Sequence, residues 1–198
     1  MRIALSMIVG LLLTGAAVAQ DMPLHEILKP GETWIPLDKV LYRAKVVNNE
    51  PYEVVLDKKA VRRNGVVYPL PIEEPTCSAV ALGGSTLLIG DAAGGYVWAF
   101  RIEKDGSIGP GDRYCRLKLR KNETRSETSA ITMDSADRTY LATKEGIQVF
   151  DPTGRLCGVF TSPPGGKVTA LAFHGNVLRA RCGENAFARQ MLAEGPAK

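Results

Sequence analysis

The sequence predicts an all-β fold in which a unit of strands is repeated along the chain. One observation behind this prediction is the alternation of short apolar runs with turn-forming residues. The runs lie at residues 86–89, 96–100 and 147–150, and the turns contain pairs such as Asp105-Gly106. Short apolar runs separated by Gly, Pro, Asn and Asp are typical of strands and hairpins.

The other observation is the repeat itself. Three segments open alike, with small residues before an apolar one, and they begin at Ser78, Ser129 and Thr169. Each opening is followed by a second and a third strand pattern, and together these form one repeat unit. The first unit has a fourth strand pattern at residues 113–119, and the second unit has one at 156–160. Four strands in roughly 40 to 50 residues match one blade of a β-propeller. An ordinary sandwich also has short strands, but it would not repeat their order in register.

The predicted class is therefore all-β and β-propeller-like, with about four recognisable blades in a chain of this length. Within the N-terminal part, strand patterns occur only at residues 42–47, 52–56 and 66–70. Two arrangements stay open: a small irregular ring, or an open arc that a second copy completes as a homo-oligomer. The predicted parts are a signal peptide at 1–19, an N-terminal segment with a poorly defined first blade at 20–70, propeller blades at 71–192, and a tail at 193–198.

Residues 1–19 have the order of a secretory signal. Arg2 precedes an apolar run over residues 3–13, and small residues follow up to Ala19. This run is shorter than the about 18 apolar residues that a membrane span needs, and no later segment is apolar enough to span. We expect cleavage close to Gln20 and a secreted or periplasmic protein without a membrane span.

The charge balance argues against a nucleic-acid partner. The chain has 25 basic and 21 acidic residues, a formal net charge of +4, which is too even for a nucleic-acid-binding domain. The densest basic stretch is residues 116–125, where charges first alternate with leucines. This alternation would place the charges on one face of a strand. The pattern favours a solvated edge strand protected by charge over an anion-binding site.

The cysteines are widely spaced and include no Cys-x-x-Cys pair; they are Cys77, Cys115, Cys157 and Cys182. With only two histidines in the chain, the spacing of a zinc site is absent. Export would permit disulfides, for which three pairings exist, and small buried thiols suit the sequence equally well. The sequence leaves both alternatives open.

The most specific run in the sequence is TYLATKEGIQVFDPTGRLCGV within residues 129–159, and residues 78–91, 94–108 and 167–173 have related patterns. On these segments the chain resembles the senescence marker protein/gluconolactonase (regucalcin-like) β-propeller family, as a divergent bacterial secreted member. The resemblance implies a propeller, in the family six-bladed, with one divalent metal in its central channel. It also implies hydrolysis of sugar lactones, in which the metal acidifies a bound water or polarises the lactone carbonyl.

The resemblance also implies a set of oxygen ligands for calcium: a Glu in an E-G-P segment of the first blade, two Asn side chains and an Asp. No E-G-P segment occurs in this chain, and two of the other ligand positions fall on Thr76 and Ser129. Neutral hydroxyls bind calcium weakly, because the charge of the ligands sets the affinity. These residues therefore predict a degenerate metal site and count against Ca²⁺ as a cofactor.

Other carboxylates are candidates to replace the family ligands. Asp91 and Asp134 are the candidate metal ligands, and Glu127 and Asp134 are the candidate catalytic residues. Asp91 and Asp134 also stand where an aspartate caps a strand or a turn, and this structural interpretation is favoured. Glu127 lies in a polar loop just before Ser129, where a glutamate is usually solvated.

Two functions follow from these observations. The first is an exported gluconolactonase-like propeller protein whose ancestral activity is metal-dependent hydrolysis of sugar lactones and whose metal site is degenerate; any activity would be that of a lactonase-type hydrolase. The alternative is a non-enzymatic binding or scaffold module for a sugar, a peptide or a protein partner. Carboxylates that converge on the channel would favour the first, and an apolar or plugged channel the second.

Overall fold

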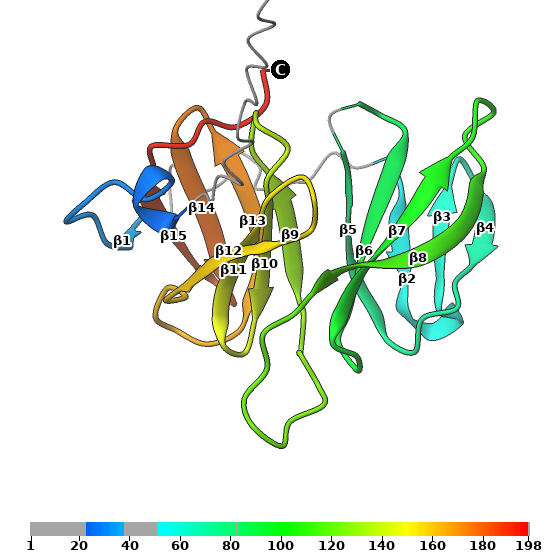
Figure 1. The fold of residues 1–198 in the computed structure, drawn as a ribbon, viewed down its shortest axis with the longest axis horizontal. Coiled ribbons are helices and arrows are strands. Elements are labelled where there is room, and N and C mark those ends of the chain that lie inside the picture. The colour runs from blue at the N-terminus through cyan, green and yellow to red at the C-terminus, as the bar shows by residue number, and fades with distance from the viewer. Residues whose placement is uncertain (1–22, 38–50, 82, 198) are drawn as a thin grey trace, which may run out of the picture.

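The computed structural model describes residues 23–37, 51–81 and 83–197, and in them four antiparallel sheets form a four-blade β-propeller (Figure 1). The predicted fold class is confirmed. In these described ranges helix is limited to two short 3₁₀ turns, η1 (Leu24–Glu26) and η3 (Leu56–Lys58). Across the described ranges no helix is long and apolar enough to cross a bilayer. The predicted signal peptide at residues 1–19 lies outside the described residues.

The sheets follow one another along the chain. The first contains β2 (Glu53–Val55), β3 (Ala60–Arg63) and β4 (Val66–Pro69). The second contains β5 (Pro75–Val80), β6 (Thr86–Asp91), β7 (Tyr96–Ile102) and β8 (Ile108–Arg116). The third contains β9 (Ala130–Met133), β10 (Thr139–Thr143), β11 (Gly146–Phe150) and β12 (Leu156–Phe160). The fourth contains β13 (Val168–His174), β14 (Val177–Cys182), β15 (Asn185–Gln190) and β1 (Ile35–Pro36).

The first strands of the four sheets face one another. β2 contacts β5, β5 contacts β9, and β9 contacts β13, so these are the inner strands of successive blades. The three similar openings in the sequence fall here: Ser78 lies in β5, Ser129 directly precedes β9, and Thr169 lies in β13. Small residues suit this position because the inner strands of neighbouring blades approach closely.

The fourth sheet is completed by a segment from the other end of the chain. β1 pairs antiparallel with β15, with Ile35 opposite Ala188, and the Leu37 amide donates to the Ala186 carbonyl oxygen (2.8 Å). A bridge between Leu28 and Met191 extends the connection toward η1. The outer strand of the last blade therefore comes from the N-terminal segment.

Within the described residues the first sheet has three strands. Two of them lie within the patterns predicted at 52–56 and 66–70, and the pattern at 42–47 lies outside the described residues. The sheet is tied to the second blade through Tyr52, which is buried. Its hydroxyl donates to the Gly106 carbonyl oxygen (2.8 Å), and its own carbonyl oxygen accepts from the Ser78 hydroxyl (2.8 Å).

The apolar core lies between neighbouring blades. One cluster includes Val61 of the first sheet and Ile89 of the second, and a further one includes Leu88 of the second and Leu141 of the third. The remaining cluster joins the third and fourth sheets and contains Ile27 of the N-terminal segment, which has no exposed surface. The propeller is held together mainly by this apolar packing, since burial of apolar surface is the dominant favourable contribution to folding.

The basic stretch after β8 differs from its prediction. A strand was expected over residues 113–119, but β8 ends at Arg116. The next residues are held by a side chain instead of a partner strand: the Lys118 amide donates to Gln148 Oε1 (2.9 Å) and Gln148 Nε2 donates to the Lys118 carbonyl oxygen (2.8 Å). The alternation of leucines and charges survives, because Leu117 is buried while Lys118 and Arg120 are exposed.

All four cysteines are free thiols in the structure. Cys77, Cys115 and Cys182 are buried, and Cys157 is half-buried. Burial raises the pKa of the Cys77 thiol to about 11 and that of Cys115 to about 12. Thiols with such pKa values are poor nucleophiles at neutral pH, so these two cysteines act as small core residues.

Candidate functional site

A cavity of about 320 Å³ lies where the four inner strands meet. Every blade contributes to its wall, which identifies it as the central cavity of the propeller. The residues that line it are Tyr52, Glu53, Val54, Thr76, Cys77, Ser78, Ser129, Ala130, Ile131, Thr169, Ala170 and Leu171. Both positions on which the family ligands fall, Thr76 and Ser129, are therefore brought together at this wall.

The polar groups of the central cavity are mostly neutral hydroxyls. The Thr76 and Thr128 hydroxyls are 2.9 Å apart, and the Thr76 hydroxyl also donates to the Gly90 carbonyl oxygen (3.3 Å). The space beside them is tight, because a Cβ at Gly90 would lie 2.6 Å from the Cys77 sulfur. These contacts fix the Thr76 side chain at the junction of the second and third blades.

One carboxylate, Glu53 on β2, belongs to the described lining of this cavity. It pairs with Arg62 on the neighbouring strand, with 2.6 Å between Arg62 Nη2 and Glu53 Oε2. The resemblance implied a glutamate in the first blade, and the sequence comparison missed Glu53 because it stands in Pro51-Tyr52-Glu53 and not in an E-G-P segment. Its position on the inner strand of a poorly patterned blade could be found only from the structure.

Asp134, a candidate for both metal binding and catalysis, lies outside this cavity. Its carboxylate is fully buried and accepts bonds from the Ala136 and Arg138 amides (2.9 and 3.1 Å). It also accepts from Arg138 Nε (2.5 Å) and the Tyr140 hydroxyl (2.8 Å). Its oxygens are thus occupied in stabilising the turn between β9 and β10.

Asp91, the other candidate metal ligand, has a structural role similar to that of Asp134. It is buried, and its Oδ1 accepts from the Glu74 amide (3.1 Å) and the Ala93 amide (3.2 Å). These bonds join the start of the second blade to the turn after β6. Like Asp134, it is absent from the lining of the central cavity.

Asp151 repeats the arrangement of Asp134 in the last turn of the third blade, between β11 and β12. Its carboxylate accepts from the Thr153 and Arg155 amides (2.9 and 3.0 Å) and from the Arg155 side chain (3.2 Å). Burial alone would raise the pKa of the Asp151 carboxyl, but the bonds from Thr153 and Arg155 outweigh it and hold the pKa below its ordinary value. Two turns of this blade, β9–β10 and β11–β12, therefore depend on an aspartate followed four residues later by arginine.

The lowered pKa of Asp151 leads to a pH-dependent prediction. A carboxyl whose pKa is lower in the folded state stabilises the fold at neutral pH, and this contribution disappears as the pH falls below about 4 toward the folded pKa. We expect Asp151→Asn to lower the free energy of unfolding most at pH 7 and progressively less below pH 4, as measured by urea unfolding. The exposed Asp57→Asn is the control. An Asp151→Asn difference that is the same at pH 3 and pH 7 would contradict the prediction.

Glu127, the other candidate catalytic residue, lines an adjoining cavity of about 280 Å³ with Ser129, Lys144 and Lys167. Its side chain is 51% exposed and lies 3.9 Å from the Lys144 amino group. Its φ of +52° is one that L-residues rarely adopt. Ser129 lines both cavities, so Glu127 stands beside the central cavity and is absent from its lining.

The described residues do not fit a calcium ion. Calcium takes six to eight oxygen ligands and depends on carboxylates for affinity. Thr76 and Ser129 offer neutral hydroxyls, Glu53 is neutralised by Arg62, and within the described ranges no group of three or more His, Cys, Asp or Glu side chains could hold a metal. The donor set of the central cavity suits hydrogen bonding to neutral polar groups better.

Comparison with known proteins shows a similarity of this structure to solved propeller structures. No family model and no curated protein matches the sequence. The calcium-binding protein regucalcin of Agrobacterium tumefaciens superposes with a TM-score of 0.57 at 15% identity, over 70% of this chain and 54% of regucalcin. A luciferin-regenerating enzyme gives 0.54 at 16% identity, over 74% and 53% of the two chains. A gluconolactonase of Xanthomonas campestris gives 0.50 at 16% identity, over 67% and 44%.

The chain spans about half the length of these proteins. At such low identity the likeness concerns the fold, and a fold does not by itself determine an activity. The structural likeness agrees with the resemblance in the sequence, which involves the same kinds of propeller. The chain thus has the fold of the gluconolactonase, regucalcin and luciferin-regenerating enzyme propellers.

Proposed function

We propose that this chain is an exported, gluconolactonase-like propeller protein that binds a small sugar-like ligand in its central cavity and has lost metal-dependent lactone hydrolysis. The observation that supports this most is the lining of the cavity. It contains hydroxyls where the resemblance implies metal ligands, and its one described carboxylate is paired with Arg62. The proposal of export rests on the sequence of residues 1–19.

The chemistry of the cavity favours binding over turnover. Hydrolysis of this type needs a metal that acidifies a water or polarises the lactone carbonyl. A sugar or lactone, in contrast, presents hydroxyl and carbonyl groups, which pair well with side-chain hydroxyls such as those of Thr76 and Ser129. The volume of about 320 Å³ is within the range of small-molecule sites.

The test separates ligand binding from metal-dependent hydrolysis. We expect calorimetry to detect no micromolar calcium binding by the purified protein, and gluconolactone hydrolysis to be the same with and without chelator. We expect binding of gluconolactone or glucose to weaken about three- to tenfold in Thr76→Val, because one hydrogen bond contributes about 0.5–1.5 kcal/mol. Thr124→Val, at an exposed threonine outside the cavity, is the matched control and should bind as the wild type does.

Two results would overturn this function. One is micromolar calcium binding with chelator-sensitive hydrolysis that Glu53→Gln or Glu127→Gln abolishes, since a rearranged metal site would then be active. The other is sugar binding that Thr76→Val and Thr124→Val leave equally unchanged, since the ligand would then not occupy the central cavity.

A further inference from the structure

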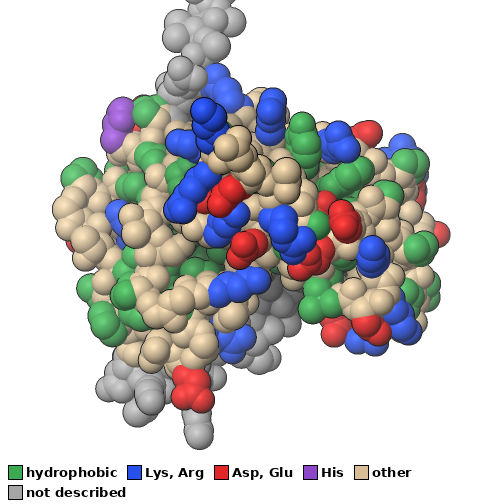
Figure 2. All heavy atoms as spheres, turned by 90° about the horizontal axis from the view of Figure 1, so that it is seen from below, with side chains coloured by type: hydrophobic (Ala, Val, Ile, Leu, Met, Phe, Trp, Pro, Cys, Tyr) green, Lys and Arg blue, Asp and Glu red, His purple; other side chains and the backbone are tan. Residues whose placement is uncertain are grey.

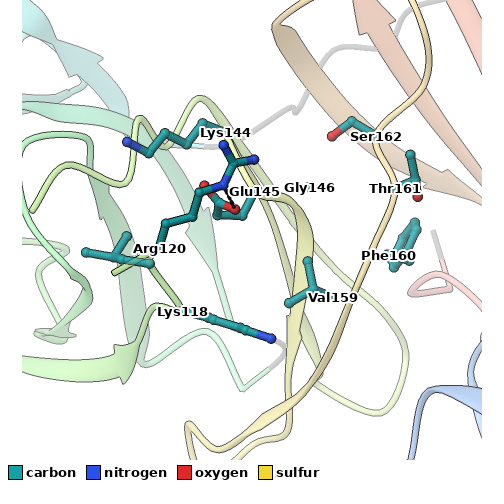
Figure 3. Close-up of a pocket in the computed structure, with 10 residues that line it drawn as sticks. Lys118, Arg120, Lys144, Glu145, Gly146, Val159, Phe160, Thr161 and Ser162 are labelled. Carbon is teal, nitrogen blue, oxygen red and sulfur yellow. Dashed lines mark hydrogen bonds and ion pairs between the residues drawn. The ribbon is translucent and has the colours of Figure 1, made fainter. Parts of the chain in front are cut away.

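A second pocket, of about 500 Å³, lies on the outside of the third blade. It is formed by the segment after β8, the turn between β10 and β11, and the end of β12. Figure 2 shows that Lys and Arg side chains gather with Asp and Glu side chains on the face seen from below. The lining of the pocket, drawn in Figure 3, includes three cationic side chains, Lys118, Arg120 and Lys144, and one carboxylate, Glu145.

The walls of this outer pocket are fixed by a buried side chain. Gln148 has no exposed surface, and its amide bonds both the N–H and the carbonyl oxygen of Lys118. The same Nε2 donates to Thr143 Oγ1 (3.2 Å), which accepts from the Glu145 amide (3.2 Å) and donates to the Gly146 carbonyl oxygen (2.9 Å). One network thus joins the main chain of Lys118 to the turn that contains Lys144 and Glu145.

The opposite wall is held by close contact. Gly146 has a φ of +124°, and a Cβ there would lie 2.5 Å from the Phe160 carbonyl oxygen. The turn is therefore pressed against the end of β12, which leads into Thr161 and Ser162. The pocket is preorganised on both sides, and preorganisation lowers the entropic cost of binding a ligand.

The ion pairs determine which charge is available to a ligand. Arg120 Nε donates to Glu145 Oε2 (2.8 Å). The Lys144 amino group lies 2.8 Å from Glu123 Oε2 and 3.9 Å from Glu127 Oε1. The bond from Lys144 holds the pKa of the Glu123 carboxyl below its ordinary value, so this pair is fully charged at neutral pH. In Figure 3 the Lys144 amino group points away from Ser162, whereas the Lys118 amino group points toward Val159.

Lys118 is the remaining cation. Among the described residues no ion pair involves its amino group, so this positive charge is available to a ligand. Facing it across the pocket are the hydroxyl-bearing residues Thr161 and Ser162, and Figure 3 shows the Ser162 hydroxyl directed toward the side of Arg120 and Lys144. A single positive charge matches an anion of single charge, and the hydroxyls match hydroxyl groups of the same ligand.

We infer that the outer pocket binds a hydroxylated monocarboxylate, the class to which sugar acids belong. The carboxylate lies at Lys118, and a hydroxyl group of the ligand bonds to Ser162 on the facing wall. The volume of about 500 Å³ accommodates a six-carbon acid. This site goes beyond the function proposed above, because it needs neither the central cavity nor lactone chemistry.

The experiment is a titration of isotope-labelled protein with sodium gluconate, followed by NMR at low ionic strength. We expect gluconate to shift the amide signals of Gly146 and Ser162 and to leave those of Thr76 and Ser129 unchanged, which separates this site from the central cavity. Lys118→Gln is expected to weaken gluconate binding at least tenfold. Lys121→Gln, an exposed lysine in the same segment that does not line the pocket, is expected to leave it unchanged.

Two further ligands and one further variant test the specificity. Ser162→Ala should weaken gluconate binding several-fold and leave acetate binding as it is, because acetate has no hydroxyl group. The site assignment is overturned if Lys118→Gln binds gluconate like the wild type, or if Lys121→Gln weakens binding equally. The assignment to a hydroxylated monocarboxylate is overturned if inorganic phosphate or acetate binds as tightly as gluconate.

Discussion

Replacing Asp134 with alanine is expected to lower the free energy of unfolding by about 3–5 kcal/mol, the usual cost of breaking a buried ion pair. The carboxylate has no exposed surface and accepts bonds from two amides, the Arg138 guanidinium and the Tyr140 hydroxyl. Burial, and after it the Asp134 charge, raise the pKa of Tyr140 far above its ordinary value, so that its hydroxyl remains a donor. The substitution leaves all of these donors without this acceptor in the core.

Urea unfolding of Asp134→Ala checks this value. Asp112→Ala is the matched control, because Asp112 is an exposed aspartate on β8 and surface substitutions usually change stability by less than about 0.5 kcal/mol. Equal losses in the two variants would show that the buried network contributes little. A stable Asp134→Ala protein would also reopen the question of a catalytic or metal-binding part for this residue.

Replacing Ile27 with alanine should lower the free energy of unfolding by about 2–5 kcal/mol, as is usual for truncating a large buried side chain. Ile27 has no exposed surface and belongs to the core cluster between the third and fourth blades. Its carbonyl oxygen accepts from the Leu192 amide (2.9 Å), so the backbone is anchored and cannot readily fill the space that a smaller side chain leaves.

Ile35→Ala is the control variant. Ile35 lies on β1 and is 57% exposed, so its truncation should lower the free energy of unfolding only slightly. Urea or thermal unfolding of both variants measures the two losses of stability. If Ile27→Ala is as stable as Ile35→Ala, the N-terminal segment is attached by strand pairing alone, and the packing of Ile27 is not what fixes it to the propeller.

The blades of the middle and last parts of the chain could be predicted because their signals are local. The similar openings at Ser78, Ser129 and Thr169 lie in or directly before the inner strands of successive sheets, and the pattern at residues 156–160 coincides with β12. By contrast, β1 is a two-residue strand that pairs with β15 near the other end of the described chain. No local periodicity indicates a pairing between residues so distant in sequence.

The candidate site was predicted in part. Thr76 and Ser129 do line the central cavity, because the resemblance extends over their strands. Asp91 and Asp134 are instead turn and strand caps, and which backbone amides reach a carboxylate depends on the three-dimensional course of the turn. Glu53 was missed because the first blade lacks the small-residue opening that marks the others. At residues 116–125 the sequence favoured a solvated edge strand over an anion-binding site. The bonds between Gln148 and Lys118 that shape the outer pocket join residues 30 apart in the chain, so no local pattern indicates them.

The pairing of β1 with β15 has a consequence for the order of folding. A propeller whose last blade takes its outer strand from the N-terminal segment cannot complete that blade until the C-terminal strands have been made. The two ends must meet across nearly the whole described chain, and the entropy of closing so large a loop is lost before the contact is gained. Proteins dominated by such distant contacts fold slowly. The ring thus closes late, and until then the edge of β15 is open to pairing with another chain.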